Sequence, residues 1–205
     1  MESLKKTLLC IILAGGKGTR LDGKGKLNQR LNNKTLLEHV YDRIKNQFNL
    51  IAINVNNEKR STDLELELIF DKFSGNIGPL AGIHSALYYG NNKLGKNGYV
   101  FTVPVDTPFL PKDLARRLYD NIIKYNSDVV MAKSGDRVHP TVAIWKNSLK
   151  SELELKINKG IRKIDLFTSE LKVTFVEWKI SKLDPFYNIN NYDDLKKAKK
   201  MKMVY

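Results

Sequence analysis

The segment 14–26, AGGKGTRLDGKGK, combines glycines with cationic side chains in a way that suits the binding of phosphate groups. Glycines let the backbone approach a ligand closely, and backbone N–H groups can then point at an anion. Lysine supplies a compact charge, and arginine supplies a planar fork of donors for phosphate oxygens. Because the apolar run 8–13 precedes the segment, we predict a triphosphate-binding loop after the first strand, with these cations: Lys17, Arg20, Lys24 and Lys26.

This loop matches neither of two familiar phosphate-binding patterns. The Walker A pattern requires GxxxxGK[ST], and the dinucleotide fingerprint GxGxxG requires a third glycine that the segment 16–21 lacks. A flexible basic turn therefore remains the alternative interpretation of the segment.

Asp106 is the most informative single residue, because it directly follows the apolar run 99–105. A carboxylate at the end of a strand, beside a phosphate-binding loop, can hold Mg²⁺ against phosphates. The sequence DTP at this point would also support an Asx-type turn, which is the alternative. Asn54 and Asp71 end two further apolar runs, and the glycine-flanked helix start within 75–82 offers a second candidate anion site.

The three histidines are less informative. A structural role is favoured for His39, which lies on a predicted helix. His139 begins a predicted strand, and the role of His84, just inside another helix, is ambiguous. The sequence has no cluster of Cys and His that would bind zinc, and we recognise no Ser-His-Asp catalytic triad. Cys10 is the only cysteine and lies in the first apolar run, which predicts a buried, inert thiol.

Apolar runs alternate with amphipathic segments along the chain, which predicts a three-layer α/β fold with a mainly parallel sheet. The short turn 134–136 allows one strand to return antiparallel. The segment 31–35 has turn chemistry, and Thr35 with Glu38 three residues later predicts a capping box at the start of the next helix. Ligands of such sheets bind at the carboxyl ends of the strands, where the candidate residues gather. The predicted strands are 8–13, 50–55, 66–70, 99–105, 128–132, 138–145 and 173–178, and the predicted helices are 36–48, 58–64, 79–89, 112–125, 148–158, 162–167 and 192–202.

Composition places the chain among ordinary globular domains. Its 205 residues predict one domain, 1–205, with room for a sizeable core. No apolar run reaches the length of a membrane span and no signal peptide is recognisable, so we expect a cytoplasmic protein. The formal net charge of +13 comes from lysines spread along the chain, and this favours an anionic small substrate over nucleic acid.

Five motifs in this order resemble the molybdenum cofactor guanylyltransferase (MobA) family: LAGGKGTR, GPLAG, PVDTPFLP, HPTVAIW and NINNYDDL. The resemblance spans 11–197 and implies a Rossmann-like nucleotidyltransferase fold. It also implies transfer of GMP from Mg-GTP to the terminal phosphate of molybdopterin that carries molybdenum, with release of pyrophosphate. As protein partners it suggests molybdenum-insertion proteins and molybdoenzyme chaperones.

The resemblance also implies roles for individual residues. Arg20, Lys26 and Asp106 would be catalytic, with Asp106 also holding Mg²⁺. The segments around Gly82, His139, Asn188 and Asn190 would lie toward the pterin. GTP would be bound by Leu13, Ala14, Gly15, Gly16, Lys26, Asn54, Asp71 and Asp106.

The chain departs from the family pattern within the first loop. Gly25 stands where the family usually has Asp before the lysine, and Asp22 is a candidate substitute. The string GGKGTRL also resembles sugar-1-phosphate nucleotidyltransferases, but no proline precedes Lys26. Three alternatives therefore stay open: a cytidylyltransferase of the same cofactor, a sugar-phosphate nucleotidyltransferase, and a non-catalytic nucleotide- or nucleic-acid-binding domain. The LAGG form of the loop favours guanine over cytosine.

Overall fold

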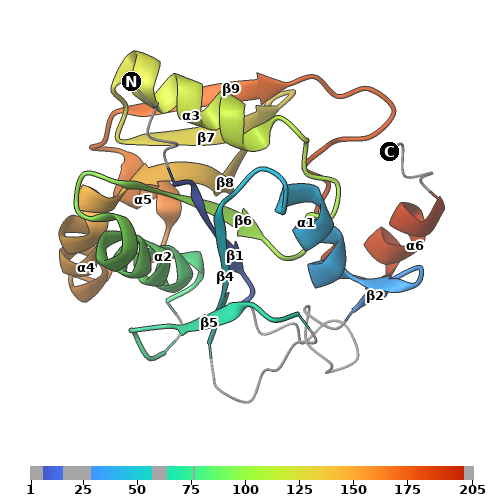
Figure 1. Cartoon of the computed structure of the whole chain (residues 1–205), viewed down its shortest axis with the longest axis horizontal. Helices are drawn as coiled ribbons and strands as arrows, with labels where there is room; N and C mark the ends of the chain where they lie inside the picture. The colour runs from blue at the N-terminus through green and yellow to red at the C-terminus, as the bar shows by residue number, and fades with distance from the viewer. Residues whose placement is uncertain (1–6, 16–28, 57–63, 76, 201–205) are drawn as a thin grey trace.

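The computed structural model describes residues 7–15, 29–56, 64–75 and 77–200. A seven-stranded sheet in the order β5-β4-β1-β6-β8-β7-β9 runs through the molecule (Figure 1). Its strands are β1 (Leu9–Leu13), β4 (Leu50–Val55), β5 (Glu67–Phe70), β6 (Tyr99–Pro104), β7 (Val129–Ser134), β8 (Arg137–Lys146) and β9 (Val173–Trp178). A separate hairpin pairs β2 (Arg30–Leu31) with β3 (Lys34–Thr35).

The pairing directions confirm the predicted mainly parallel sheet with one antiparallel strand. Strands β5, β4, β1 and β6 pair in parallel, and so do β7 and β9. Strand β8 alone in this sheet runs against both of its neighbours, β6 and β7. The β7–β8 turn is short because Gly135 adopts a positive φ of 52°.

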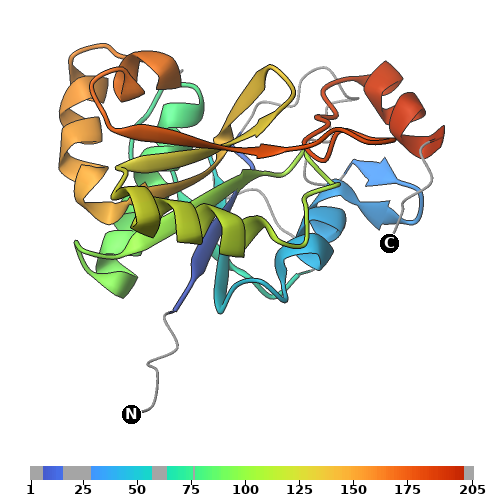
Figure 2. The ribbon, with the colours of Figure 1, turned by 90° about the horizontal axis from the view of Figure 1, so that it is seen from above.

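Helices cover both faces of the sheet, as an α/β fold requires (Figure 2). The apolar residues of β1 alternate between the two layers, since Cys10 and Ile12 pack against one set of helices and Leu9 and Ile11 against the other. One layer holds α1 (Leu36–Ile44) and α3 (Leu114–Tyr125), and the other holds α2 (Pro79–Leu94), α4 (Lys150–Asn158) and α5 (Ile164–Thr168).

A third, smaller apolar cluster joins the C-terminal part of the chain to the hairpin. Helix α6 (Tyr192–Lys200) contributes Leu195 and Ala198, which pack with Leu31 of β2 and with Phe109 and Ile189. Figure 1 shows α6 beside β2 at one end of the sheet. Within the described residues, no helix has the length and apolar character that crossing a membrane requires.

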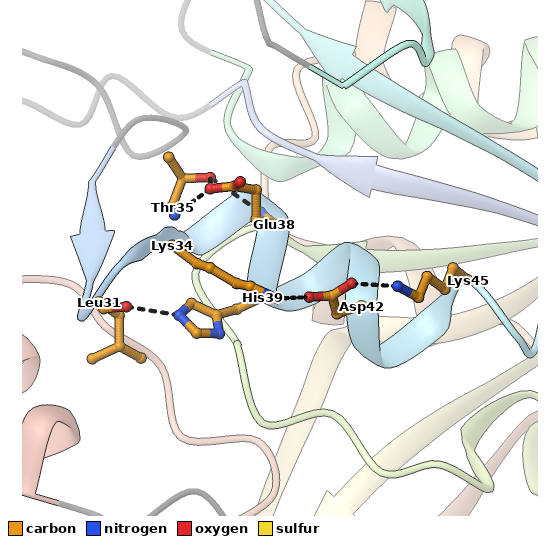
Figure 3. A network of polar contacts seen from close by, with 7 residues as sticks. All are labelled: Leu31, Lys34, Thr35, Glu38, His39, Asp42 and Lys45. Atoms are coloured by element: carbon orange, nitrogen blue, oxygen red, sulfur yellow. Dashed lines mark hydrogen bonds and ion pairs between the residues drawn. The ribbon is translucent and has the colours of Figure 1, made fainter. Parts of the chain in front are cut away.

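Two of the predicted local features are confirmed in detail. Thr35 caps α1 in a capping box, because its hydroxyl accepts from the Glu38 N–H at 3.1 Å while the Thr35 N–H donates to the Glu38 carboxylate at 2.6 Å (Figure 3). Cys10 is fully buried as a free thiol, and burial raises its pKa.

Other boundaries differ from the sequence expectations. The helix expected to end at residue 89 continues to Leu94. Gly90 lies inside it and serves close packing, since a Cβ there would lie 2.8 Å from Asn147 Oδ1. The predicted turn 31–35 is the β2–β3 hairpin, with Asn32 at a φ of 56°. Most of the predicted helix 58–64 and the end of the last helix lie outside the described residues.

Candidate functional site

A cavity of about 310 Å³ lies at the carboxyl ends of β1, β4, β5 and β6, where the sequence places the candidate residues. Seven residues predicted to form the site line it: Leu13, Ala14, Gly15, Asn54, Asp71, Gly82 and Asp106. The structure therefore brings together polar groups from four strand ends and one helix start.

Strand register sets these residues level with one another. Leu13 pairs with Asn54 of β4 on one side and with Pro104 of β6 on the other. The ladder continues past the strands, since Ala14 N–H donates to Asn54 O at 2.8 Å and Val105 N–H donates to Leu13 O at 3.1 Å. The backbone at the end of β1 is thereby fixed between its neighbours.

Asn54 and Asp71 form a hydrogen-bonded pair in the wall of the cavity. The Asn54 side chain is 1% exposed, and its Nδ2 donates to Asp71 Oδ1 at 2.9 Å and to Ile69 O at 3.4 Å. These two bonds use both N–H donors of the amide. Partial burial raises the pKa of Asp71, and the hydrogen bond from Asn54 works in the opposite direction.

Gly82 and Gly15 flank the Asn54 amide. A Cβ on Gly82 would lie 2.5 Å from Asn54 Oδ1, so glycine is the residue that lets α2 approach the amide so closely. A Cβ on Gly15 would lie 3.5 Å from Asp71 Oδ2 and 3.6 Å from Asn54 Oδ1, which is ordinary contact distance. The two glycines therefore differ: Gly82 is required by the protein's own packing, whereas Gly15 leaves room at the cavity.

The start of α2 forms another wall of the cavity. Gly78 is the N-cap residue with φ 69° and ψ −153°, a conformation that side chains disfavour, and Pro79 occupies the first turn. Among the described residues, no side chain caps this helix start. Pro79 has no N–H, and the Ala81 N–H donates to Gly78 O at 3.3 Å, so the anion-binding role that the sequence suggested for this helix start stays a prediction.

Asp106 lies two residues beyond the end of β6 and is 6% exposed. Its carbonyl accepts a hydrogen bond from Ile189 N–H at 2.9 Å, which ties the segment 188–190 to the strand end. No group of three or more His, Cys, Asp or Glu that could hold a metal ion occurs among the described residues. The single carboxylate of Asp106 is compatible with a divalent cation that takes its remaining ligands from water and substrate phosphates.

Asn188 and Asn190 do not line the cavity. They flank Ile189 in the chain, and the Ile189 N–H donates to the carbonyl of Asp106. Asn188 Oδ1 is buried and accepts no hydrogen bond from the residues that the structure describes. The backbone N–H of Asn190 donates to Asp194 Oδ2 at 3.0 Å, which fastens the segment to α6. The backbone of the segment 188–190 is thus tied to Asp106 on one side and to α6 on the other.

The His139 side chain is buried in a packed cluster and does not face the cavity. Its Nε2 lies 2.7 Å from Ser134 Oγ, and its ring packs 4.8 Å from the ring of Phe186. Burial lowers the pKa of His139, and the Asp184 carboxylate opposes this shift. His39 is likewise structural, because its Nε2 lies 2.8 Å from Leu31 O.

Several residues line the cavity that the sequence did not single out, among them Asn56, Ile77 and Thr141. Thr141 belongs to HPTVAIW and reaches the cavity because β8 pairs antiparallel with β6. That motif was the available signal, but nothing in it distinguishes Thr141 from its neighbours. Gly16, Arg20 and Lys26 lie outside the described residues, so their roles stay predictions.

Comparisons with known proteins identify the family. Residues 10–171 match the model of the MobA-like NTP transferase domain. A molybdenum cofactor guanylyltransferase from Rhodopseudomonas palustris (strain HaA2) is 35% identical over 195 residues, which cover 94% of this chain and 91% of that protein.

Solved structures agree with this result. The molybdopterin-guanine dinucleotide biosynthesis protein A from Archaeoglobus fulgidus is 31% identical with a TM-score of 0.76, over 94% of this chain and 97% of that one. The 4-diphosphocytidyl-2C-methyl-D-erythritol synthase from Anaerococcus prevotii, 14% identical with a TM-score of 0.68 over 95% of each chain, shares the fold alone. The chain belongs to the molybdenum cofactor guanylyltransferase family of MobA-like nucleotidyltransferases.

Proposed function

We propose that this enzyme transfers GMP from GTP to molybdopterin that carries molybdenum and releases pyrophosphate, using the cavity at the strand ends for the nucleotide. We assign the nucleotide to this cavity because Asn54, Asp71 and Asp106 converge there at one edge of the sheet. The names of the relatives supply the reaction, and the fold and the polar lining of the cavity are consistent with it.

Asn54 and Asp71 are the groups that we propose for recognition of guanine. Guanine carries two neighbouring donors, N1–H and the exocyclic amine, beside the O6 acceptor. Asn54 Nδ2 already donates to Asp71 and Ile69, so Asn54 and Asp71 together offer a ligand only acceptor atoms. A site of acceptors suits the two guanine donors better than cytosine, whose ring nitrogen N3 is itself an acceptor.

Asp106, Arg20 and Lys26 are the residues that we propose for the triphosphate. Asp106 would hold Mg²⁺, an ion that neutralises charge on the phosphates when bound. Arg20 and Lys26, together with the N–H groups of Gly15 and Gly16, would neutralise the remaining phosphate charge. The start of α2 also lines the cavity, and its helix dipole would add a favourable potential for the phosphates.

The acceptor would approach from the side of Gly82, Asn188 and Asn190. Its terminal phosphate oxygen would attack the α-phosphorus of GTP, forming one P–O bond while the bond from the α-phosphorus to the β-bridging oxygen breaks. Pyrophosphate leaves with that electron pair. Because a phosphate monoester is already nucleophilic near neutral pH, positioning and charge neutralisation suffice for catalysis.

A competition assay tests this assignment. The enzyme receives equal GTP, CTP and ATP with molybdenum-loaded molybdopterin, and the products are identified by mass spectrometry. We expect the guanine dinucleotide to dominate by roughly a hundredfold, as hydrogen-bonding sites discriminate strongly. A cytosine dinucleotide as the main product would reject guanylyl transfer, and pyrophosphate release with sugar phosphates alone would reject the pterin acceptor.

A further inference from the structure

The segment 71–75, which leads from β5 toward α2, forms part of the wall of the nucleotide cavity. Asp71 and Gly75 line the cavity, and Asp71 also holds the Asn54 amide. The middle of the segment faces α2 and contributes no cavity-lining residue. Contacts that hold residues 72–74 against α2 therefore also restrict the position of Asp71.

Two contacts hold it there. The rings of Phe73 and His84 meet edge to face, with their centroids 4.8 Å apart and an interplanar angle of 74°. The N–H of Lys72 donates to the hydroxyl of Ser85 at 3.3 Å. Adjacent residues of the segment thus contact adjacent residues of α2, and His84 supplies the apolar part of this attachment.

The His84 ring lies in surroundings that suit its neutral form. It is 2% exposed, and neither ring nitrogen has a hydrogen-bond partner among the described residues. Its Nε2 lies 3.7 Å from Glu154 Oε2 of α4, beyond hydrogen-bond distance. Burial lowers the pKa of His84, the nearby Lys150 and Lys72 act in the same direction, and Glu154 opposes them.

We propose that His84 is a positioning residue for GTP binding, whose neutral ring holds Phe73 and thereby keeps Asp71 in place in the cavity wall. This inference rests on the proposed function in one respect, namely that the cavity binds GTP. His84 itself lines no part of the cavity and contacts no proposed substrate group.

The proposal gives GTP binding a component that depends on pH. The packed arrangement favours the neutral imidazole over the charged one, so its contribution is fully present above the ordinary pKa of 6.5 and is lost as the pH falls through the lower pKa of the folded state. Protonation of His84 would place a positive charge beside Phe73 and near Lys72 and Lys150. Only the half-exposed Glu154 would offset that charge in part. GTP affinity should therefore fall on acidification by more than the titration of GTP itself explains.

The test measures the Kd of GTP by calorimetry, without the pterin acceptor and with Mg²⁺ present, at about pH 7.5 and about pH 5.5. His84→Gln cannot titrate and should lose part of the acid-dependent weakening that the parent shows. Phe73→Ala should raise the Kd at the higher pH by about two- to tenfold, the equivalent of one aromatic pair, and should leave kcat at saturating GTP nearly unchanged.

His39→Gln is the matched control. His39 is also a buried histidine on a helix, 6% exposed, but its ring bonds to Leu31 O and lies away from the segment 71–75. This substitution should lower thermal stability and leave both the Kd of GTP and its pH dependence as in the parent. Where Phe73→Ala fails to fold, Phe73→Leu, which keeps an apolar side chain, takes its place.

The outcomes separate the inference from the proposed function. If the parent binds GTP, but His84→Gln shows the same pH dependence or the Phe73 variant binds with parental affinity, the positioning role is wrong and the proposed function stands. If the parent binds no GTP at either pH, the proposed function fails and this inference fails with it.

Discussion

A second cavity is larger than the one at the strand ends but does not carry the candidate site. A cavity of about 590 Å³ lies between α1, residues 108–109 and residues 181–185, whereas the cavity at the strand ends measures about 310 Å³. In the larger cavity the Asp42 carboxylate is paired with lysines: it accepts from Lys34 at 2.5 Å and from Lys45, just outside the lining, at 2.6 Å (Figure 3). His39 and Arg43 are bonded to backbone carbonyls there.

The two cavities keep their carboxylates in opposite electrostatic conditions. Burial alone would raise the pKa of Asp42, but its hydrogen bonds from Lys34 and Lys45 bring it below its ordinary value. The pKa of Asp71 is raised, because a single hydrogen bond from Asn54 does not offset partial burial. The raised pKa of Asp71 shows that its carboxylate lacks a compensating partner within the described part of the fold. This feature, rather than the volume of the cavity, indicates where a ligand binds.

The largest expected effect separates the two cavities by activity. Asp106→Asn should keep the fold and reduce GMP transfer by at least about a hundredfold, because it removes the charge proposed to hold Mg²⁺. Asp42→Asn in the larger cavity should leave turnover within about twofold, since it removes only partly exposed ion pairs. Both are measured by pyrophosphate release at saturating GTP. Near-normal turnover of Asp106→Asn at high Mg²⁺ would remove Asp106 from the site.

A pair of glycine variants tests the packing around Asn54. Gly82→Ala should destabilise the protein by about 1–3 kcal/mol, because the new Cβ would overlap Asn54 Oδ1. Gly15→Ala should change the stability by less than about 1 kcal/mol, since its Cβ would meet only ordinary contacts. Thermal unfolding of both variants without nucleotide provides the measurement. Equal stabilities would mean that α2 does not approach the amide as closely as described.

Asp71→Asn should separate binding from stability. We expect the Kd of GTP to rise by about tenfold, because a charged acceptor is lost, and the preference for GTP over CTP to narrow. A raised pKa means that Asp71 stabilises the fold below its ordinary pKa of 3.8 and loses that contribution as the pH rises through the folded-state value. At neutral pH the variant should therefore be at least as stable as the parent.

Asp42→Asn provides the opposite case for stability. The pKa of Asp42 is lowered, so its contribution is present above its ordinary value of 3.8 and is lost as the pH falls. This variant should be slightly less stable at neutral pH and bind GTP normally. If Asp71→Asn instead destabilises the protein at neutral pH, the electrostatic contrast between the two cavities is wrong.

The smallest effect concerns the helix that borders the larger cavity. Thr35→Ala removes the N-cap of α1 and should cost about 1 kcal/mol, which lowers the Tm by about 2–4 °C in a chain of this length. The Kd of GTP should stay at the parental value, because α1 contributes nothing to the cavity at the strand ends. A change in GTP affinity would show that the two cavities are coupled.

The sequence by itself determined the elements and the edge of the sheet at which the candidate residues gather. Apolar runs that end in Asn54, Asp71 and Asp106 sufficed, because parallel strands bring their carboxyl ends to one edge whatever the details of packing. The antiparallel β8 and the capping box at Thr35 also follow from short-range patterns, the first from a short turn and the second from spacing on a helix.

Only the tertiary structure decided how those residues act on one another. The Asn54–Asp71 bond, the close approach of Gly82 to that amide and the bond from Ile189 to Asp106 join residues 17, 28 and 83 positions apart. His84 was ambiguous in the sequence for the same reason, since its partner Phe73 lies on the segment before its own helix. Such contacts depend on the register of strands and the packing of a helix on the sheet, and no local pattern of residues encodes either.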